Sequence, residues 1–188
     1  MNERKNIFWT EALKGGTIIG LVSVAFELVM QASVEMTALT TILSVVSTMA
    51  IVFISFGYTR RLAVQSDPRE GFSVGRAVGF VVAMMAIAGV LNGIYTAVMA
   101  NFVMHDELMK VVDEMMVGLQ DTIPADTFEQ TYEMMRKTVT SPLILTLSSV
   151  ISNALLGVLC GVCVGLVTRR HPDIFAPIEG ENNNSQEE

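Results

Sequence analysis

Charged residues are scarce in this chain, and the shortage is the first guide to its class. Only 16% of the 188 residues are Asp, Glu, Lys or Arg, whereas soluble globular domains carry about 25%. Hydrophobic residues make up 51%, and the mean hydropathy is +0.50. This composition disfavours a soluble domain and favours an integral membrane protein. The length fits one compact membrane domain, which we place at residues 1–170.

Cysteine and clustered basic residues are also rare. The two cysteines, Cys160 and Cys163, have the spacing of redox and metal motifs but lie in an apolar segment with no His, acid or base beside them. We interpret them as small packing residues, and we expect no disulfide framework outside the membrane. The sequence has no basic stripe of the kind that binds nucleic acid.

Motifs of catalysis are missing as well. The sequence contains no G-x-S-x-G, no phosphate-binding glycine loop, and no H-E-x-x-H around His105 or Asp113-Glu114. Several methionines near His105 offer thioethers to a soft metal, but we favour the interpretation that they fill an adaptable apolar seam. We therefore expect no enzyme activity, no cofactor and no metal site.

Four long apolar stretches are present instead, at residues of about 15–34, 38–58, 77–103 and 142–168. Each is about 20 residues or longer, as a helix must be to cross the bilayer core. Ser141-Pro142 suits the N-cap and first position of the last helix, and Arg169 and Arg170 follow it directly. A cleavable signal peptide is the competing interpretation of the first stretch, but Glu27 does not suit the apolar part of a signal. The sequence predicts an all-α, four-helix integral membrane bundle.

Residues 104–140 have a different pattern, with apolar residues at the 3.6-residue period of amphipathic helices. We expect one hydrophobic face made of Leu108, Val112, Met115, Leu119, Phe128, Tyr132 and Met135. Pro124 divides the segment, because proline ends one helix and suits the start of the next. This predicts an amphipathic helical hairpin between the third and fourth spans. Two such helices bury little by themselves, so their apolar faces require another protomer, another protein or the headgroup region.

Loop charges predict the topology. Nine of the twelve basic residues lie in the N-terminal segment, in residues 60–76 and at 169–170, whereas residues 104–140 carry eight acidic residues against three basic ones. Basic loops stay in the cytoplasm, so we expect both termini to be cytoplasmic and the hairpin extracytoplasmic. Residues 171–188 are expected to form a disordered acidic tail.

Glycines recur at four-residue spacing in three spans, at Gly16/Gly20, Gly89/Gly93 and Gly157/Gly161/Gly165. A further row begins with Gly75 and Gly79. Such spacing places the glycines on one helix face and allows a second helix to approach closely. We expect the row that ends at Gly165 to pack against another span of the same chain, with a homodimer seam as the alternative. We expect the Gly16/Gly20 and Gly89/Gly93 rows to serve helix packing as well.

One acidic residue, Glu27, falls inside the first span. Counting along each helix from its nearest basic end places Glu27, Ser44, Asn92 and Asn153 at a similar depth, roughly 20–24 Å from that boundary. Because an intramembrane acid usually faces a bundle interior or a cavity, we predict a polar layer in which Glu27 bonds to Asn92, Asn153 or Ser44. The alternative is that Glu27 lies near the outer end of a short helix and reaches water.

The order of these parts resembles a family of small bacterial membrane proteins, the domain of unknown function 4199 family, found chiefly in Bacteroidetes. The resemblance rests on Gly71-Phe72-Ser73-Val74-Gly75-Arg76-Ala77 before the third span, Gly89 through Ile94-Tyr95 within it, the acidic Met-rich hairpin, and Ser141-Pro142. It implies a four-span protein of the bacterial cytoplasmic (inner) membrane, and it implies no activity.

Two functions remain open. The first is a structural or assembly protein, or a subunit of a larger complex, that interacts through the glycine faces and the hairpin. The alternative is a small carrier or channel subunit that uses the polar layer around Glu27. Expected partners are the lipid bilayer and either further copies of the chain or another membrane protein, without nucleic acid.

Overall fold

Helices make up almost all of the regular structure. The computed structural model describes residues 2–33, 37–67, 69–119 and 124–173. These form α1 (Asn2–Ala32), α2 (Thr37–Gln65), α3 (Val74–Val98), a short π-helix η1 (Met99–Val103), α4 (His105–Leu119), α5 (Ala125–Thr140) and α6 (Pro142–Thr168). The predicted all-α class is confirmed. Residues 34–36 of the first turn and residues 174–188 of the predicted tail lie outside the described residues.

Four of the helical segments are long and apolar enough to cross a membrane: Asn6–Ala32, Thr37–Gln65, Val74–Val103 and Pro142–Thr168. The first two extend beyond their predicted bounds. The polar start at residues 2–14 is already helical, and α2 continues beyond residue 58 through Arg60 to Gln65. Leu62 and Ala63 in this extension are buried, so packing prolongs α2 until the Asp67-Pro68 sequence, where proline disfavours helix in the residue before it.

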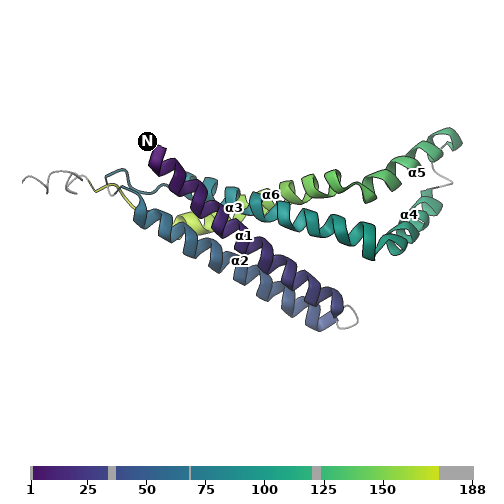
Figure 1. Cartoon of the computed structure of the whole chain (residues 1–188), viewed down its shortest axis with the longest axis horizontal. Helices are drawn as coiled ribbons and strands as arrows, with labels where there is room; N and C mark the ends of the chain where they lie inside the picture. Colours follow the sequence, from purple (N-terminus) through teal and green to yellow (C-terminus); the bar gives the residue numbers. More distant parts are fainter. Residues whose placement is uncertain (1, 34–36, 68, 120–123, 174–188) are drawn as a thin grey trace, which may run out of the picture.

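The helices are arranged as two pairs (Figure 1). α3 packs along α6, and α1 packs along α2 and against α3. The pairs lie close together at the end where α2 and α6 finish, and they diverge toward the other end, where α3 and α6 lead into α4 and α5 (Figure 1). We call the first the arginine end, because it carries Arg60, Arg61, Arg169 and Arg170, and the second the hairpin end.

The buried core lies between α1, α2 and α3, with α3 at its centre. Phe80, Met84 and Ala88 of α3 are fully buried, and so is Ile19 of α1. The ring of Phe8 meets that of Phe80 edge to face, with centroids 5.3 Å apart. α2 is far more exposed, and its Phe53 side chain is 74% accessible. Apolar side chains with that exposure suit a surface covered by lipid.

The loop between α2 and α3 is tied to the end of α6 at the arginine end. The Phe72 amide donates to the Arg170 carbonyl at 3.0 Å, and the Arg170 amide donates to the Phe72 carbonyl at 3.1 Å. The Phe72 side chain is 1% exposed. Gly71 precedes it with φ +65°, a conformation that favours glycine. This Phe72–Arg170 bridge closes the arginine end of the bundle.

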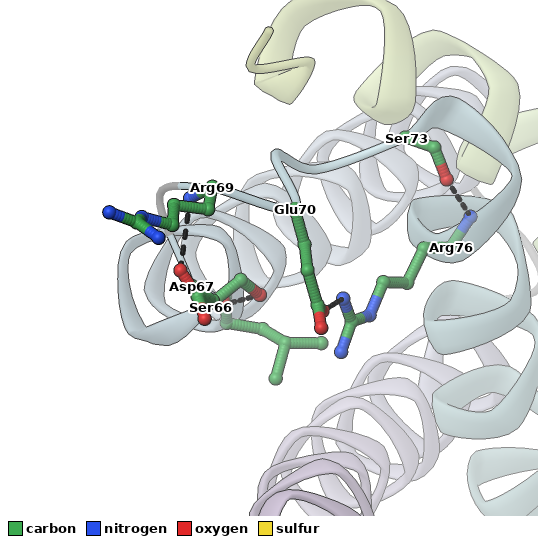
Figure 2. Close-up of polar contacts among 7 residues, drawn as sticks. Ser66, Asp67, Arg69, Glu70, Ser73 and Arg76 are labelled. Atoms are coloured by element: carbon green, nitrogen blue, oxygen red, sulfur yellow. Dashed lines mark hydrogen bonds and ion pairs between the residues drawn. The ribbon is translucent and has the colours of Figure 1, made fainter. Parts of the chain in front are cut away.

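Figure 2 shows how the same loop starts α3. Ser73 is the N-cap, and its Oγ accepts a hydrogen bond from the Arg76 amide at 3.2 Å. The Arg76 guanidinium lies 3.6 Å from the Glu70 carboxylate. The Arg69 amide donates to Asp67 Oδ1 at 2.9 Å (Figure 2). Residues 71–77, which carry part of the family resemblance, therefore cap the start of α3 and pair with the end of α6.

At the hairpin end, η1 links the third span to α4. Within it, Asn101 Nδ2 donates to the Ala97 carbonyl at 2.9 Å and to the Thr140 carbonyl at 3.0 Å. The second bond ties η1 to the end of α5. Ser141 occupies the N-cap of α6 and Pro142 follows it, as predicted, although the Ser141 side chain makes no capping bond.

Candidate functional site

An open, largely apolar cavity of about 430 Å³ lies between α1, α2 and α3 toward the hairpin end and carries several polar groups. Its lining residues are Glu27, Met30, Gln31, Thr40, Tyr95, Thr96, Met99 and Met104. Glu27, Met30 and Gln31 share one face because residues three and four apart lie together on a helix. Tyr95 of α3 and Met99 of η1 face them from the third span for the same reason. The cavity therefore combines a carboxylate, an amide and a phenol in the membrane-spanning part of the chain.

Gln31 joins two of the surrounding segments. The Tyr95 hydroxyl donates to Gln31 Oε1 at 3.3 Å, and Gln31 Nε2 lies 2.9 Å from the Met104 sulfur. A thioether is a weak acceptor, so the second contact satisfies little of the amide's hydrogen-bonding capacity. The Glu27 side chain has no hydrogen-bond partner within the described part of the chain. It is left available to water, a cation or a ligand in the cavity.

The predicted bonds from Glu27 to Asn92, Asn153 or Ser44 are not formed among the described residues. Asn92 is 7% exposed, and its Oδ1 is buried with no hydrogen-bond partner among the residues that the structure describes. Asn153 Nδ2 donates within α6 to the Ser149 carbonyl at 2.9 Å, and Ser44 is exposed on α2. Counting along helices predicts a depth but not the direction in which a side chain points. α6 lies on the other side of α3 from α1, and α2 turns Ser44 outward.

The residues that accompany Glu27 in the structure were missed in the sequence. The sequence does contain a signal for both. Gln31 lies one helical turn after Glu27, and Tyr95 lies three residues after Asn92, so each shares a helix face with a residue of the predicted layer. The π-helix next to the cavity had no clear sequence signal. Such helices are rare and frequently lie at functional sites, which adds weight to this cavity as a site.

The Gly16/Gly20 row of α1 and the Gly89/Gly93 row of α3 lie at close helix contacts. A Cβ atom on Gly16 would lie 2.6 Å from the Met84 carbonyl oxygen, and one on Gly20 2.7 Å from Leu91 Cδ1. A Cβ on Gly89 would lie 2.8 Å from Val150 Cα, and one on Gly93 2.5 Å from Thr146 Cα. These glycines allow α3 to approach α1 on one side and α6 on the other.

The row of α6 lies against α3 of the same chain. Cβ atoms on Gly157, Gly161 and Gly165 would lie 3.0, 2.9 and 3.0 Å from Val82 Cα, Val78 Cα and Val74 Cγ1. In contrast, a Cβ atom added to Gly75 or Gly79 of α3 would meet no atom of the described residues within 4 Å. The two rows therefore differ, because the row of α6 lies in a close α3–α6 contact whereas Gly75 and Gly79 face open space.

The α4–α5 hairpin buries Val112 and Met116 between its helices. Of the predicted hydrophobic face, Leu108, Phe128, Tyr132 and Met135 are half-buried. Met115 is instead 52% exposed, because the inner stripe of α4 passes through Val112 and Met116, one turn apart. The Leu119 side chain lies outside the described residues.

One hydrogen bond joins the two hairpin helices through side chains. The Tyr132 hydroxyl donates to Asp113 Oδ1 at 2.8 Å. This bond to the protonated phenol, together with the negative charge of Asp113, raises the pKa of Tyr132. The phenol therefore stays protonated and keeps the bond throughout the neutral range.

Comparison with known proteins gives a family but no activity. The chain matches the family described as "protein of unknown function (DUF4199)" over residues 14–170. No curated protein and no solved structure matches it. The match covers the hairpin, the last three spans and the first span from residue 14 onward.

Proposed function

The chain belongs to the DUF4199 family, and from its structure we propose that it is a non-enzymatic subunit of a membrane complex that binds another protein through the α4–α5 hairpin. We further propose that it resides in a bacterial inner membrane with both termini in the cytoplasm, in keeping with the charge asymmetry of its loops. The hairpin would then face the periplasmic side.

The observation that carries the proposal is the set of apolar side chains left exposed on the hairpin. Val111, Met115, Val117 and Met134 are 51%, 52%, 68% and 69% exposed. These residues lie between the third and fourth apolar spans, outside the spanning helices, so lipid tails do not account for them as they do for Phe53 of α2. Exposed apolar side chains with a polar rim mark interaction sites.

Charge favours a different protein over a second copy as the partner. Residues 104–140 carry eight acidic residues against three basic ones. Two such hairpins would repel each other, and the same acidic surface would attract a partner with basic groups around an apolar centre. The partner that fits is therefore a basic, partly apolar surface at the hairpin end.

The test is the size of the complex in native membranes. Replacing Val111 and Met115 together with serine is expected to reduce the assembled fraction about tenfold. The interface then buries less apolar area, and the serine hydroxyls must give up their water to enter it. Blue native electrophoresis of detergent extracts measures the shift to free chain. The matched control is Gln130→Ser, an exposed and uncharged position on α5, which should leave the complex intact. Equal complex in the double variant, or wild-type chain that migrates alone, contradicts the proposal.

The cavity beside Glu27 supports a second candidate function, a carrier or channel subunit. Its specific support is the Glu27 carboxylate, which lacks a hydrogen-bond partner in the described chain and faces a cavity of about 430 Å³. An acid placed in a span is costly to insert, at about 2.5–3.5 kcal/mol at a helix centre, and such acids commonly line ion or proton paths.

Proton flux separates this candidate from the first. In liposomes with a pH gradient and a pH-sensitive dye, Glu27→Gln should abolish any flux that the wild-type chain supports, because the amide cannot exchange a proton. Glu11→Gln is the control, since Glu11 pairs with Lys14 at 3.2 Å outside the cavity. Flux that persists in Glu27→Gln excludes a carrier role for this carboxylate.

A further inference from the structure

A second cavity lies at the opposite end of the bundle, where α2 and α6 meet. Its volume is about 540 Å³, and its lining residues are Phe56, Arg60, Ala63, Val64, Val167, Thr168, Arg169 and Arg170. Arg169 and Arg170 directly follow the last span, which ends at Thr168. The cavity therefore sits at the level where lipid headgroups meet the hydrocarbon core.

The charge of this cavity is positive and unbalanced. None of its described lining residues is acidic, and Arg60 and Arg169 form no ion pair within the described part of the chain. Arg170 is held in place by the Phe72–Arg170 bridge, and its Nη1 lies 3.4 Å from the Ala63 carbonyl oxygen. Neighbouring Arg61 is not part of the cavity, because its guanidinium lies over the Tyr58 ring, 5.6 Å from the centroid.

An apolar groove continues from this cavity into the membrane-spanning part. It has a volume of about 210 Å³ and is lined by Val52, Phe53, Phe56, Cys163, Val164 and Val167. Phe56 and Val167 line both spaces. The arginine cavity and the apolar groove between α2 and α6 therefore form one continuous surface.

We propose that the arginine cavity and the apolar groove together bind one anionic phospholipid of the leaflet at the arginine end. The phosphate lies among Arg60, Arg169 and Arg170, and an acyl chain lies in the groove between α2 and α6. Arginine suits this role because its planar fork donates two parallel hydrogen bonds to a phosphate. Basic pockets between spanning helices are a recognised way of holding anionic headgroups. The apolar groove distinguishes a lipid from free phosphate, which would leave it empty.

The experiment uses the full chain in a neutral detergent. Binding of phosphatidylglycerol is measured by native mass spectrometry, beside phosphatidylcholine with the same acyl chains and inorganic phosphate. Phosphatidylglycerol should bind at least about tenfold more tightly than either comparison ligand. Arg60→Gln and Arg169→Gln should each weaken it about fivefold, the contribution of one arginine near an anionic surface. Arg61→Gln, with the same change of charge, should alter it less than twofold.

A further variant tests the groove separately from the headgroup. Cys163 is exposed and lines the groove but not the arginine cavity, so Cys163→Trp should fill the groove and weaken phosphatidylglycerol binding with all three arginines intact. Melting temperatures without lipid, equal to that of the wild-type chain, show that a variant is folded. An Arg60→Gln or Arg169→Gln variant that fails this check is replaced by the lysine variant at the same position, which keeps the charge and loses the fork and should weaken binding by a smaller factor. If Cys163→Trp fails it, the smaller Cys163→Phe fills the groove in its place.

Three results would overturn the proposal. Equal losses in Arg60→Gln and Arg61→Gln would show that only general surface charge attracts the lipid. Binding of inorganic phosphate as tight as that of phosphatidylglycerol would assign the arginines to a free anion. A preference that emerges only after removal of residues 174–188, which include four glutamates, would show that the chain's own tail occupies the cavity.

Discussion

Alanine at Gly93 is expected to destabilise the bundle by about 1–3 kcal/mol, the usual cost of forcing extra volume into a packed contact. The added Cβ would lie 2.5 Å from Thr146 Cα. That neighbour is backbone, so no side-chain rotation relieves the overlap and α3 must move away from α6. The loss would be measured as the free energy of unfolding in mixed micelles with increasing SDS.

The control for this substitution lies on the same helix. Gly79→Ala makes the same chemical change where no described atom lies within 4 Å of the new Cβ. Its unfolding free energy should equal that of the wild-type chain or exceed it slightly, since alanine is the better helix former. If both variants unfold alike, the close α3–α6 contact at Gly93 does not contribute to stability, and the account of the seam is wrong.

The positions of the spans and glycine seams were predictable because they depend on local sequence. An uncharged stretch of sufficient length has few alternatives to a membrane helix, and four-residue spacing fixes which glycines share a face. That spacing does not say whether a face is covered. The row of Gly93 meets α6 whereas Gly79 meets nothing among the described residues, and the difference depends on how α3 is rotated within the bundle.

The surroundings of Glu27 were not predictable for a related reason. Counting along the helix predicts a depth for Glu27, but its partners depend on the direction each helix face takes. One residue along a helix turns the side chain by about 100°. The same sensitivity placed Met116 rather than Met115 inside the hairpin. The bridge between Phe72 and Arg170 could not be predicted either, because neither local sequence indicates a partner so distant in the chain.

Alanine at Gly71 is the second substitution with a large expected effect, because it opposes the backbone as well as the packing. Gly71 has φ +65°, and an L-residue there costs about 1–2 kcal/mol. Its Cβ would also lie 2.7 Å from the Arg170 carbonyl oxygen and 2.8 Å from the Pro172 nitrogen. The expected result is loss of the Phe72–Arg170 bridge, while the spans stay helical.

Amide hydrogen exchange at Phe72 and Arg170 measures this loss directly, because both amides donate in the bridge. Their exchange should become at least about tenfold faster in Gly71→Ala, corresponding to about 1.4 kcal/mol of local opening. Gly75→Ala, four residues later and in open space, should leave both rates unchanged. Since the bridge also holds Arg170 beside the arginine cavity, the same variant should weaken phosphatidylglycerol binding while Gly75→Ala does not. Unchanged protection in Gly71→Ala would mean that the α2–α3 loop and the end of α6 are held together by the buried Phe72 side chain alone.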